Sequence, residues 1–280
     1  MNEQSRGSSY DLLDLFGRHL VALFLRVFDS VDGERRPEPR QLVFPGVLLH
    51  TKETFFYLTA GHVLRDIENG IDSGSLIIDK SMLVDMFGFD RKTDYPIPFG
   101  LKDSSRHHLV DDDRCLDFGL IVLEPYYVKL LKANNIIPIE DENWLNQDPS
   151  VFDAFYLLGF PTSLNTKMGE VPTKLNPALV PILPMDDVPV AVLKGHPERF
   201  YGKIGDDNPL DLDGMSGGPI FAFVKSNPTR YWIAAIQNAW YRERKIVVGC
   251  RTPLIGYLVS NALEKMANQT QESDNRTGEN

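Results

Sequence analysis

One glycine-rich turn constrains this chain more than any other feature. The segment Asp213–Pro219 contains Ser216 between glycines and runs directly into the apolar segment Ile220–Val224. Glycine allows backbone conformations that are barred to other residues, so such a turn can point main-chain N–H groups at a single atom. The segment therefore predicts a reactive serine held in a tight turn that leads into a β-strand.

A base for this serine is expected at His62. A serine hydroxyl is a weak nucleophile unless a neighbouring group takes its proton. Among the six histidines of the chain, His62 is distinguished by following an apolar strand in the context Thr-Ala-Gly-His. An unperturbed imidazole titrates at about pH 6.5, so it can accept a proton at neutral pH. Activity that depends on His62 should therefore fall on acidification.

An acid that orients the histidine is expected at Asp117, which directly precedes the apolar segment Phe118–Leu123. That position allows a half-buried carboxylate, whereas the nearby run Asp111–Asp113 is typical of a solvated loop. In chain order the candidates are His62, Asp117 and Ser216. The intervals between them are long enough to hold several strands and loops.

In this order the three motifs resemble those of the chymotrypsin/trypsin superfamily of serine proteases, over about residues 20–262. The resemblance implies an all-β fold of two six-stranded antiparallel β-barrels (chymotrypsin-like), with the active site in the cleft between them. It also implies that Ser216 attacks a peptide carbonyl, His62 moves the proton and Asp117 orients His62. The main-chain N–H groups of Gly214 and Ser216 would bind the oxyanion. Neither a metal nor an organic cofactor is implied.

The resemblance and the apolar pattern together predict how the chain is divided. A C-terminal helix is expected because apolar residues recur at helical spacing after Pro253. The polar residues at the end of the chain are expected to be disordered. The predicted parts are an N-terminal extension (1–19) with a short helix at 10–18, a first β-barrel (20–145) carrying His62 and Asp117, a second β-barrel (146–252) carrying Ser216, the C-terminal helix (253–267) and a disordered tail (268–280).

Two other serine-hydrolase families are disfavoured by the order of the residues. The segment Gly214–Gly218 also fits the Gly-x-Ser-x-Gly turn of α/β-hydrolases, but those enzymes place the histidine after the serine. No histidine follows Ser216. The subtilisin order needs an acid before His62, such as Asp32, and the β-rich pattern argues against that α/β fold.

The residue before the serine departs from the digestive and clotting members of the superfamily. Those relatives carry an aspartate there, which pairs with a new N-terminus freed by cleavage, whereas this chain has Met215. No such zymogen switch is therefore expected. In this respect the chain is similar to intracellular and bacterial trypsin-like peptidases, including the catalytic domain of Deg-type proteases.

The substrate pocket is less closely determined by the sequence. By the resemblance, its walls would be about residues 209–213 and 236–239. Asp211 and Asp213 can favour a basic side chain or can be solvated loop charges, and Leu210 and Leu212 can equally line an apolar pocket. Gln237 is expected beside the substrate backbone as an edge-strand residue, which would bind a peptide by strand addition.

Composition limits the location and the partners of the chain. The formal charge of −10 argues against binding to nucleic acid or to an anionic membrane. No segment contains the roughly 18 uncharged apolar residues that a membrane helix needs, and residues 1–10 do not resemble a signal peptide. The two cysteines, Cys115 and Cys250, cannot form a disulfide scaffold, although a single bridge between them stays open. Reduced thiols and a cytoplasmic location are expected.

The sequence thus predicts a serine endopeptidase that forms an acyl-enzyme, with a polypeptide as its substrate. The alternative is a protease-fold binding or sensing module whose cleavage is weak or depends on a partner. A regulatory protein partner is a further expectation, because a cytoplasmic protease must be restrained. An esterase on the same barrel would differ only in its acyl substrate.

Overall fold

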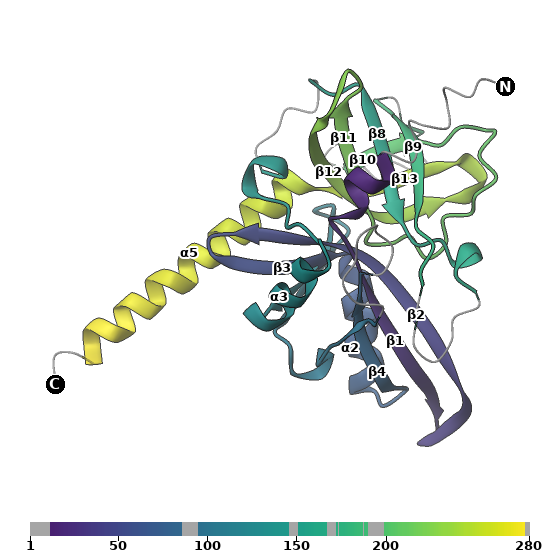
Figure 1. Ribbon diagram of the computed structural model, residues 1–280. Helices are drawn as coiled ribbons and strands as arrows, with labels where there is room; N and C mark the ends of the chain where they lie inside the picture. Colours follow the sequence, from purple (N-terminus) through teal and green to yellow (C-terminus); the bar gives the residue numbers. More distant parts are fainter. Residues whose placement is uncertain are drawn as a thin grey trace.

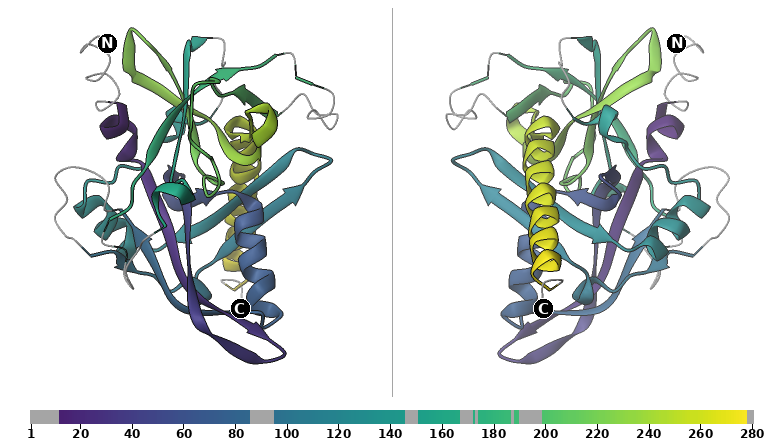
Figure 2. Two further views of the ribbon diagram at one scale, coloured as in Figure 1. Left: turned by 90° about the vertical axis from the view of Figure 1, so that its right-hand side faces the viewer. Right: turned by 90° about the vertical axis from the view of Figure 1, so that its left-hand side faces the viewer.

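The computed structural model describes residues 12–85, 95–145, 151–166, 172, 174–186, 188–189 and 199–277. Two β-units lie side by side, and a long C-terminal helix leaves the second unit and projects beyond the body (Figures 1 and 2). No helix in the described ranges has a stretch long and apolar enough to cross a bilayer.

The first unit is a seven-stranded antiparallel sheet of strand order β5-β4-β1-β2-β3-β7-β6. Helix α2 (Gly61–Asp72) follows β3, and α3 (Pro125–Ala133) follows β7. The sheet strands are β1 (Leu20–Val31), β2 (Glu34–Thr51), β3 (Thr54–Thr59), β4 (Leu76–Val84), β5 (Ile97–Pro98), β6 (Arg106–Asp111) and β7 (Leu116–Leu123).

The second unit is a closed barrel of strand order β10-β13-β12-β11-β8-β9. The all-β class, the closed six-stranded barrel and the C-terminal helix are thus confirmed. The first unit differs from the predicted six-stranded barrel, because its end strand β5 has two residues, one of them a proline that cannot donate a ladder hydrogen bond. The barrel strands are β8 (Ala154–Gly159), β9 (Ala178–Pro184), β10 (Arg199–Lys203), β11 (Pro219–Val224), β12 (Asn227–Tyr241) and β13 (Ile246–Arg251).

The C-terminal helix α5 (Thr252–Thr277) is longer than predicted. The expected disordered tail at 268–280 is wrong for residues 268–277, because no glycine or proline interrupts residues 257–277 and polar residues are compatible with an exposed helix. The helix ends just before Gly278, and residues 278–280 lie outside the described part. Midway along the helix, Glu264 pairs with Lys52 of the β2–β3 hairpin, with 2.7 Å between Oε1 and Nζ.

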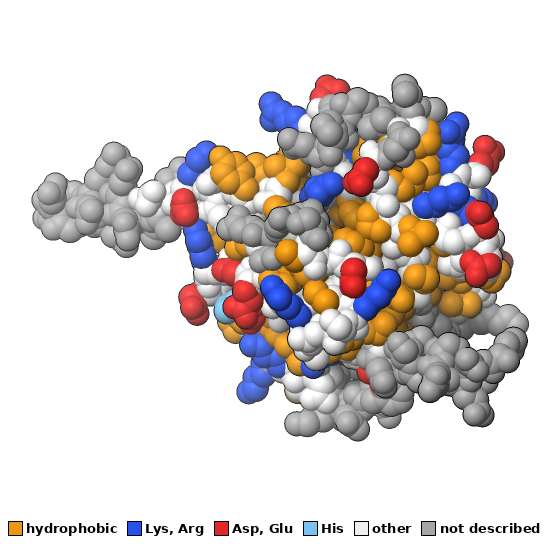
Figure 3. Space-filling model, turned by 90° about the horizontal axis from the view of Figure 1, so that it is seen from above, with side chains coloured by type: hydrophobic (Ala, Val, Ile, Leu, Met, Phe, Trp, Pro, Cys, Tyr) orange, Lys and Arg blue, Asp and Glu red, His pale blue; other side chains and the backbone are white. Residues whose placement is uncertain are grey.

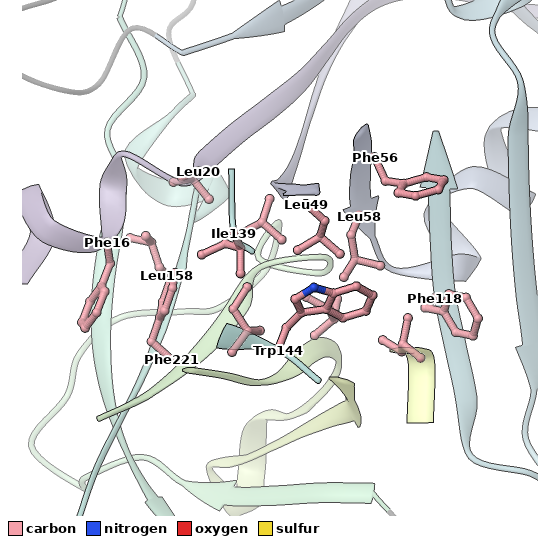
Figure 4. Packing of buried hydrophobic residues seen from close by; sticks show 14 of the residues in the cluster. Phe16, Leu20, Leu49, Phe56, Leu58, Phe118, Ile139, Trp144, Leu158 and Phe221 are labelled. Atoms are coloured by element: carbon pink, nitrogen blue, oxygen red, sulfur yellow. The ribbon is translucent and has the colours of Figure 1, made fainter. Parts of the chain in front are cut away.

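A single apolar cluster joins the two units. It combines residues of the sheet, of the segment after α3, of the barrel and of α5. Figure 4 shows side chains from both units meeting around the buried Trp144. The predicted boundary at 145/146 borders residues 146–150, which lie outside the described part. The labelled members are Phe16, Leu20, Leu49, Phe56, Leu58, Phe118, Ile139, Trp144, Leu158 and Phe221.

The described part of the N-terminal extension belongs to this shared core. Residues 12–17 are helical, which places Leu12 and Phe16 on one face. The Phe16 ring stacks on Phe221 of β11 with centroids 4.4 Å apart. The segment before β1 is therefore a packed element of the fold, and the prediction for residues 1–9 lies outside the described residues.

Surface charges are mixed on the face shown in Figure 3. Lys and Arg side chains are interspersed there with Asp and Glu side chains, around apolar ones. The described residues of this face therefore carry no broad field of one sign.

A buried histidine links the same N-terminal segment to the barrel. The His19 Nδ1–H donates to the main-chain oxygen of Ile137 at 2.7 Å, and Nε2 accepts from the Tyr231 hydroxyl at 2.6 Å. Burial lowers the pKa of His19 to about 4, against the hydrogen bond to Ile137, which raises it. The imidazole is therefore neutral in the folded protein near neutral pH.

We expect His19 to make the free energy of unfolding depend on pH. Its pKa is lower in the folded state than the ordinary value of about 6.5, so the unfolded chain binds more protons between about pH 4 and 6.5, and stability falls as the pH falls through that window. Over the whole window, the free energy of unfolding should change by about 3 kcal/mol. Urea unfolding of the wild type and of His19→Gln from pH 7 to pH 4.5 measures this pH dependence of the free energy of unfolding. Equal pH dependence in the two proteins would contradict the assignment.

Candidate active site

His62 and Asp117 form a two-point contact between α2 and β7. Asp117 Oδ1 accepts the main-chain N–H of His62 at 2.8 Å, and Oδ2 accepts from Nδ1 at 2.8 Å. The first N–H groups of a helix lack intrahelical partners, so the carboxylate satisfies one of them. With Nδ1–H as the donor, the lone pair of Nε2 is left to accept a proton. The exposed fractions of the two side chains are 26% and 16%.

The local sequence explains this contact. Strand β3 ends at Thr59, paired with Gly119 of the adjacent β7, and α2 begins at Gly61. A Cβ atom at Gly61 would lie 2.7 Å from the main-chain oxygens of Leu109 and Phe118. Glycine at 61 thus lets the first turn of α2 lie directly on the β6–β7 pair, which brings His62 to the carboxylate of Asp117.

The serine turn is held by main-chain hydrogen bonds from Met215, Gly217 and Gly218. Met215 N–H donates to Leu212 at 3.0 Å, and Gly217 N–H donates to Gln237 at 2.8 Å. In the part of the chain that the structure describes, the N–H groups of Gly214 and Ser216 have no hydrogen-bond partner. These are the two groups that the resemblance implies for the oxyanion, and the turn leaves both of them available.

Positive φ angles shape the same turn. Gly214 has φ +87° and Gly217 has φ +95°, conformations that favour glycine. A Cβ atom on Gly214 would collide with Thr162 Oγ1. Met215 between them is fully buried in the barrel core and packs over Gly159.

The serine turn and the end of β3 lie in direct contact. A Cβ atom on Gly217 would collide with Thr59 Oγ1 and Pro45 O, and would lie 3.1 Å from Ala60 N. Ala60 precedes His62 by two residues, and Ser216 precedes Gly217, so this contact brings the candidate base and nucleophile into one region. Among the described residues, no hydrogen bond joins Ser216 to His62.

The predicted pocket residues have different surroundings. Asp211 and Asp213 both pair with Arg242, with 2.6 Å from Nη2 to each Oδ2. The hydrogen bond to Asp213 and the charge of Asp211 raise the pKa of Arg242. Leu210 lines a surface pocket, whereas Leu212 is buried in the barrel core. Arg242 was missed because only the fold brings it to residues 211–213.

Gln237 does not have the predicted edge-strand role. Its main-chain N–H donates to Gly218 at 2.9 Å, and its oxygen accepts from Gly217 at 2.8 Å, so both groups are used inside the turn. The side chain is 1% exposed. After Gln237, β12 pairs with β13 on one side, and no pairing on its other side is found among the described residues. Residues 238–241 are therefore the open edge that the sequence pattern did not reveal.

Both cysteines are buried and neither is in a disulfide, so the Cys115–Cys250 bridge that the sequence left open is not formed. Burial raises the pKa of the Cys250 thiol to about 12. A neutral, buried thiol is a poor nucleophile, so Cys250 does not compete with Ser216 for that role.

When the chain is compared with known proteins, similarity is found only at the level of structure. No protein-family model matches the sequence, and no curated protein is similar to it. The thermostable serine protease AL20 from an extremophilic microorganism has TM-score 0.48 and 14% identity, with 85% of this chain and 93% of that chain covered. Rv3671c from M. tuberculosis H37Rv, in an inactive mutant form, has TM-score 0.42 and 11% identity, with 89% of each chain covered. Both TM-scores lie below 0.5, so the case for the site depends on the geometry of this chain.

We expect Gly217→Ala to destabilise the protein more than Gly74→Ala. Both glycines have positive φ, which costs alanine about 1–2 kcal/mol. A Cβ atom at Gly74 meets nothing within 4 Å, whereas one at Gly217 collides with the main-chain oxygen of Pro45 in β2 and with the side-chain hydroxyl of Thr59 in β3. The collision should add about 1–3 kcal/mol. Urea unfolding of both variants measures the difference, and equal losses would contradict close contact between the turn and β3.

Proposed function

We propose that this chain is a serine-type endopeptidase that hydrolyses peptide bonds through a Ser216–His62–Asp117 triad and an acyl-enzyme. The observation that carries the proposal is the two-point contact of the Asp117 carboxylate with His62. A carboxylate that accepts from Nδ1 fixes the tautomer in which Nε2 can act as a base. Two observations support it further: among the described residues the N–H groups of Gly214 and Ser216 have no hydrogen-bond partner, and the adjacent Gly217 contacts the end of β3.

The proposed reaction begins when Ser216 Oγ attacks the carbonyl carbon of the scissile peptide bond while His62 Nε2 takes the hydroxyl proton. The carbonyl oxygen becomes an oxyanion that accepts hydrogen bonds from the N–H groups of Gly214 and Ser216; losing one such donor typically costs about 2.7–4 kcal/mol of transition-state stabilisation. His62 then returns the proton to the leaving amine as the C–N bond breaks. Water, deprotonated by His62, hydrolyses the ester and regenerates Ser216.

The open edge at residues 238–241 supports binding of an extended peptide. Main-chain groups of a strand edge can pair with a substrate backbone and hold it in register. Because this edge follows Gln237, whose main chain bonds to Gly217 and Gly218, a peptide paired there would pass beside the serine turn.

The site is proposed to assemble without cleavage of the chain. Met215 holds the turn through burial in the barrel core, so no ion pair with a freed N-terminus is needed. The lack of a disulfide between the two cysteines supports a cytoplasmic location for the enzyme. The likeness to Deg-type catalytic domains is supported by the sequence motifs, and neither solved structure reported above is named as one of that type.

A protease-fold binding or sensing module with partner-dependent cleavage is the second candidate. It is favoured by one observation, the absence of a hydrogen bond between Ser216 and His62 among the described residues. Catalytic hydrogen bonds often tighten only when substrate is bound, so this observation does not displace the first candidate.

Labelling with a fluorophosphonate probe tests the proposal. The wild type should form a covalent adduct at Ser216, because an activated serine attacks phosphorus as it would attack a carbonyl. Ser216→Ala and His62→Ala should not be labelled. Intact-mass measurement of the folded proteins detects the adduct. A wild type that is folded but unlabelled, with and without candidate peptides, would contradict the endopeptidase and favour the binding module.

We expect Asp117→Asn to lower kcat/KM by about 10³–10⁴-fold while the protein stays folded. The new amide can keep the contact with the His62 N–H, but its NH₂ group would face Nδ1 and would favour the tautomer with the proton on Nε2. The matched control is Asp113→Asn in the exposed loop, which makes the same charge change. Peptide hydrolysis and urea unfolding are measured on all three proteins, and a loss below tenfold would contradict the role of Asp117.

A further inference from the structure

A pocket of about 280 Å³ is anchored to the serine turn on both sides. One wall leads directly into the turn, and the other follows Gln237, whose main chain bonds to Gly217 and Gly218. Arg242 ties the second wall to Asp213 at the entrance of the turn. The lining residues are Ile204, Asn208, Pro209, Leu210, Asp211, Trp240, Arg242 and Lys245.

The inner surface of this pocket is mainly apolar. Ile204 is buried in the barrel core, and Leu210 and Trp240 pack against that core from the pocket side. Transfer of an apolar side chain from water to such a surface is favourable in proportion to the area it buries. The walls therefore suit a large aliphatic or aromatic side chain.

The carboxylates at the pocket are already paired with a cation of the same chain, and the other charged side chains there are positive. Arg242 Nη2 lies 2.6 Å from Asp211 Oδ2 and 2.6 Å from Asp213 Oδ2, so both carboxylates are engaged by one guanidinium. Lys245 Nζ donates to the main-chain oxygen of Asp206 at 2.6 Å and keeps its positive charge. A cationic side chain in the pocket would meet these two cations and would have to displace Arg242 from its carboxylates.

We infer that Arg242 is a specificity-determining residue, and that the pocket takes a large uncharged apolar side chain from the residue on the acyl side of the scissile bond and rejects lysine and arginine. The inference rests on the proposed endopeptidase activity. It argues against the alternative, left open by the sequence, that Asp211 and Asp213 select a basic side chain, because the structure pairs both with a residue of the same chain.

Peptide substrates that differ only at the residue before the scissile bond test this inference. With Leu, Phe, Lys and Arg at that position, the wild type should give a kcat/KM for Leu or Phe at least about tenfold above that for Lys or Arg. In Arg242→Gln the ratio of Lys to Leu should rise about five- to tenfold, because Asp211 and Asp213 become available to the substrate cation. Faster cleavage after Lys than after Leu by the wild type would overturn the inference.

The control is Arg244→Gln, which makes the same charge change two residues away. Arg244 is exposed and lines a different surface depression, so the ratio of Lys to Leu should not change. Adding Asp211→Asn and Asp213→Asn to Arg242→Gln should abolish the gain for Lys. An equal rise in the Arg244 variant, or a gain that survives the loss of both carboxylates, would also overturn the inference.

Ligand binding separates failure of this inference from failure of the proposed activity. Benzamidinium is an aromatic cation, and benzamide is its neutral counterpart of nearly equal shape. By calorimetry on Ser216→Ala protein, which needs no turnover, benzamide should bind at least as tightly as benzamidinium, and the added Arg242→Gln change should reverse the order. Tighter benzamidinium binding with Arg242 intact would overturn the inference, whereas absent fluorophosphonate labelling with the expected binding order would overturn only the proposed activity.

Discussion

The apolar cluster between the sheet and the barrel is the constraint on which the candidate site depends. His62 and Asp117 belong to the first unit and Ser216 to the second, so their relative positions are only as fixed as the interface between the units. Close-packed interiors resist deformation, since small displacements forfeit many contacts. Trp144 and the stacked pair Phe16 and Phe221 lie in that interface and are almost completely buried. Packing of apolar side chains between the units therefore sets the geometry of the candidate site.

Backbone contacts then fix the position of the serine turn more closely than the apolar core does. Gly217 lies against Thr59 and Ala60 without room for a Cβ atom, and its N–H bonds to Gln237. The same turn leaves the N–H groups of Gly214 and Ser216 without partners in the described structure. Unpaired main-chain donors are normally avoided, so two of them beside a serine support the proposed oxyanion site. In the proposed reaction both would donate hydrogen bonds to the oxyanion.

The sequence predicted what depends on local pattern and failed where distant residues decide. The apolar segments predicted the strands, and the resemblance of the motifs to those of a known family implied that His62 and Asp117 meet, as their 2.8 Å contacts show. The length of α5 was underestimated because polar residues allow an exposed helix as well as disorder. Gln237 was misassigned because its pairing with Gly217 and Gly218 depends on strand register. Arg242 was missed because an ion pair between two loops leaves no periodic signal.

The buried Met215 also bears on how the site is kept formed. Digestive and clotting serine proteases, which carry an aspartate at this position, form the site through an ion pair, whose strength depends on pH and on salt. Here the turn is anchored by an apolar side chain in the barrel core. Hydrophobic burial does not titrate, so this anchor of the turn does not depend on pH, whereas the ion pair between Asp213 and Arg242 at the entrance of the turn is a charged contact. A loss of activity on mild acidification in protein that is still folded would therefore not be explained by loss of the Met215 anchor.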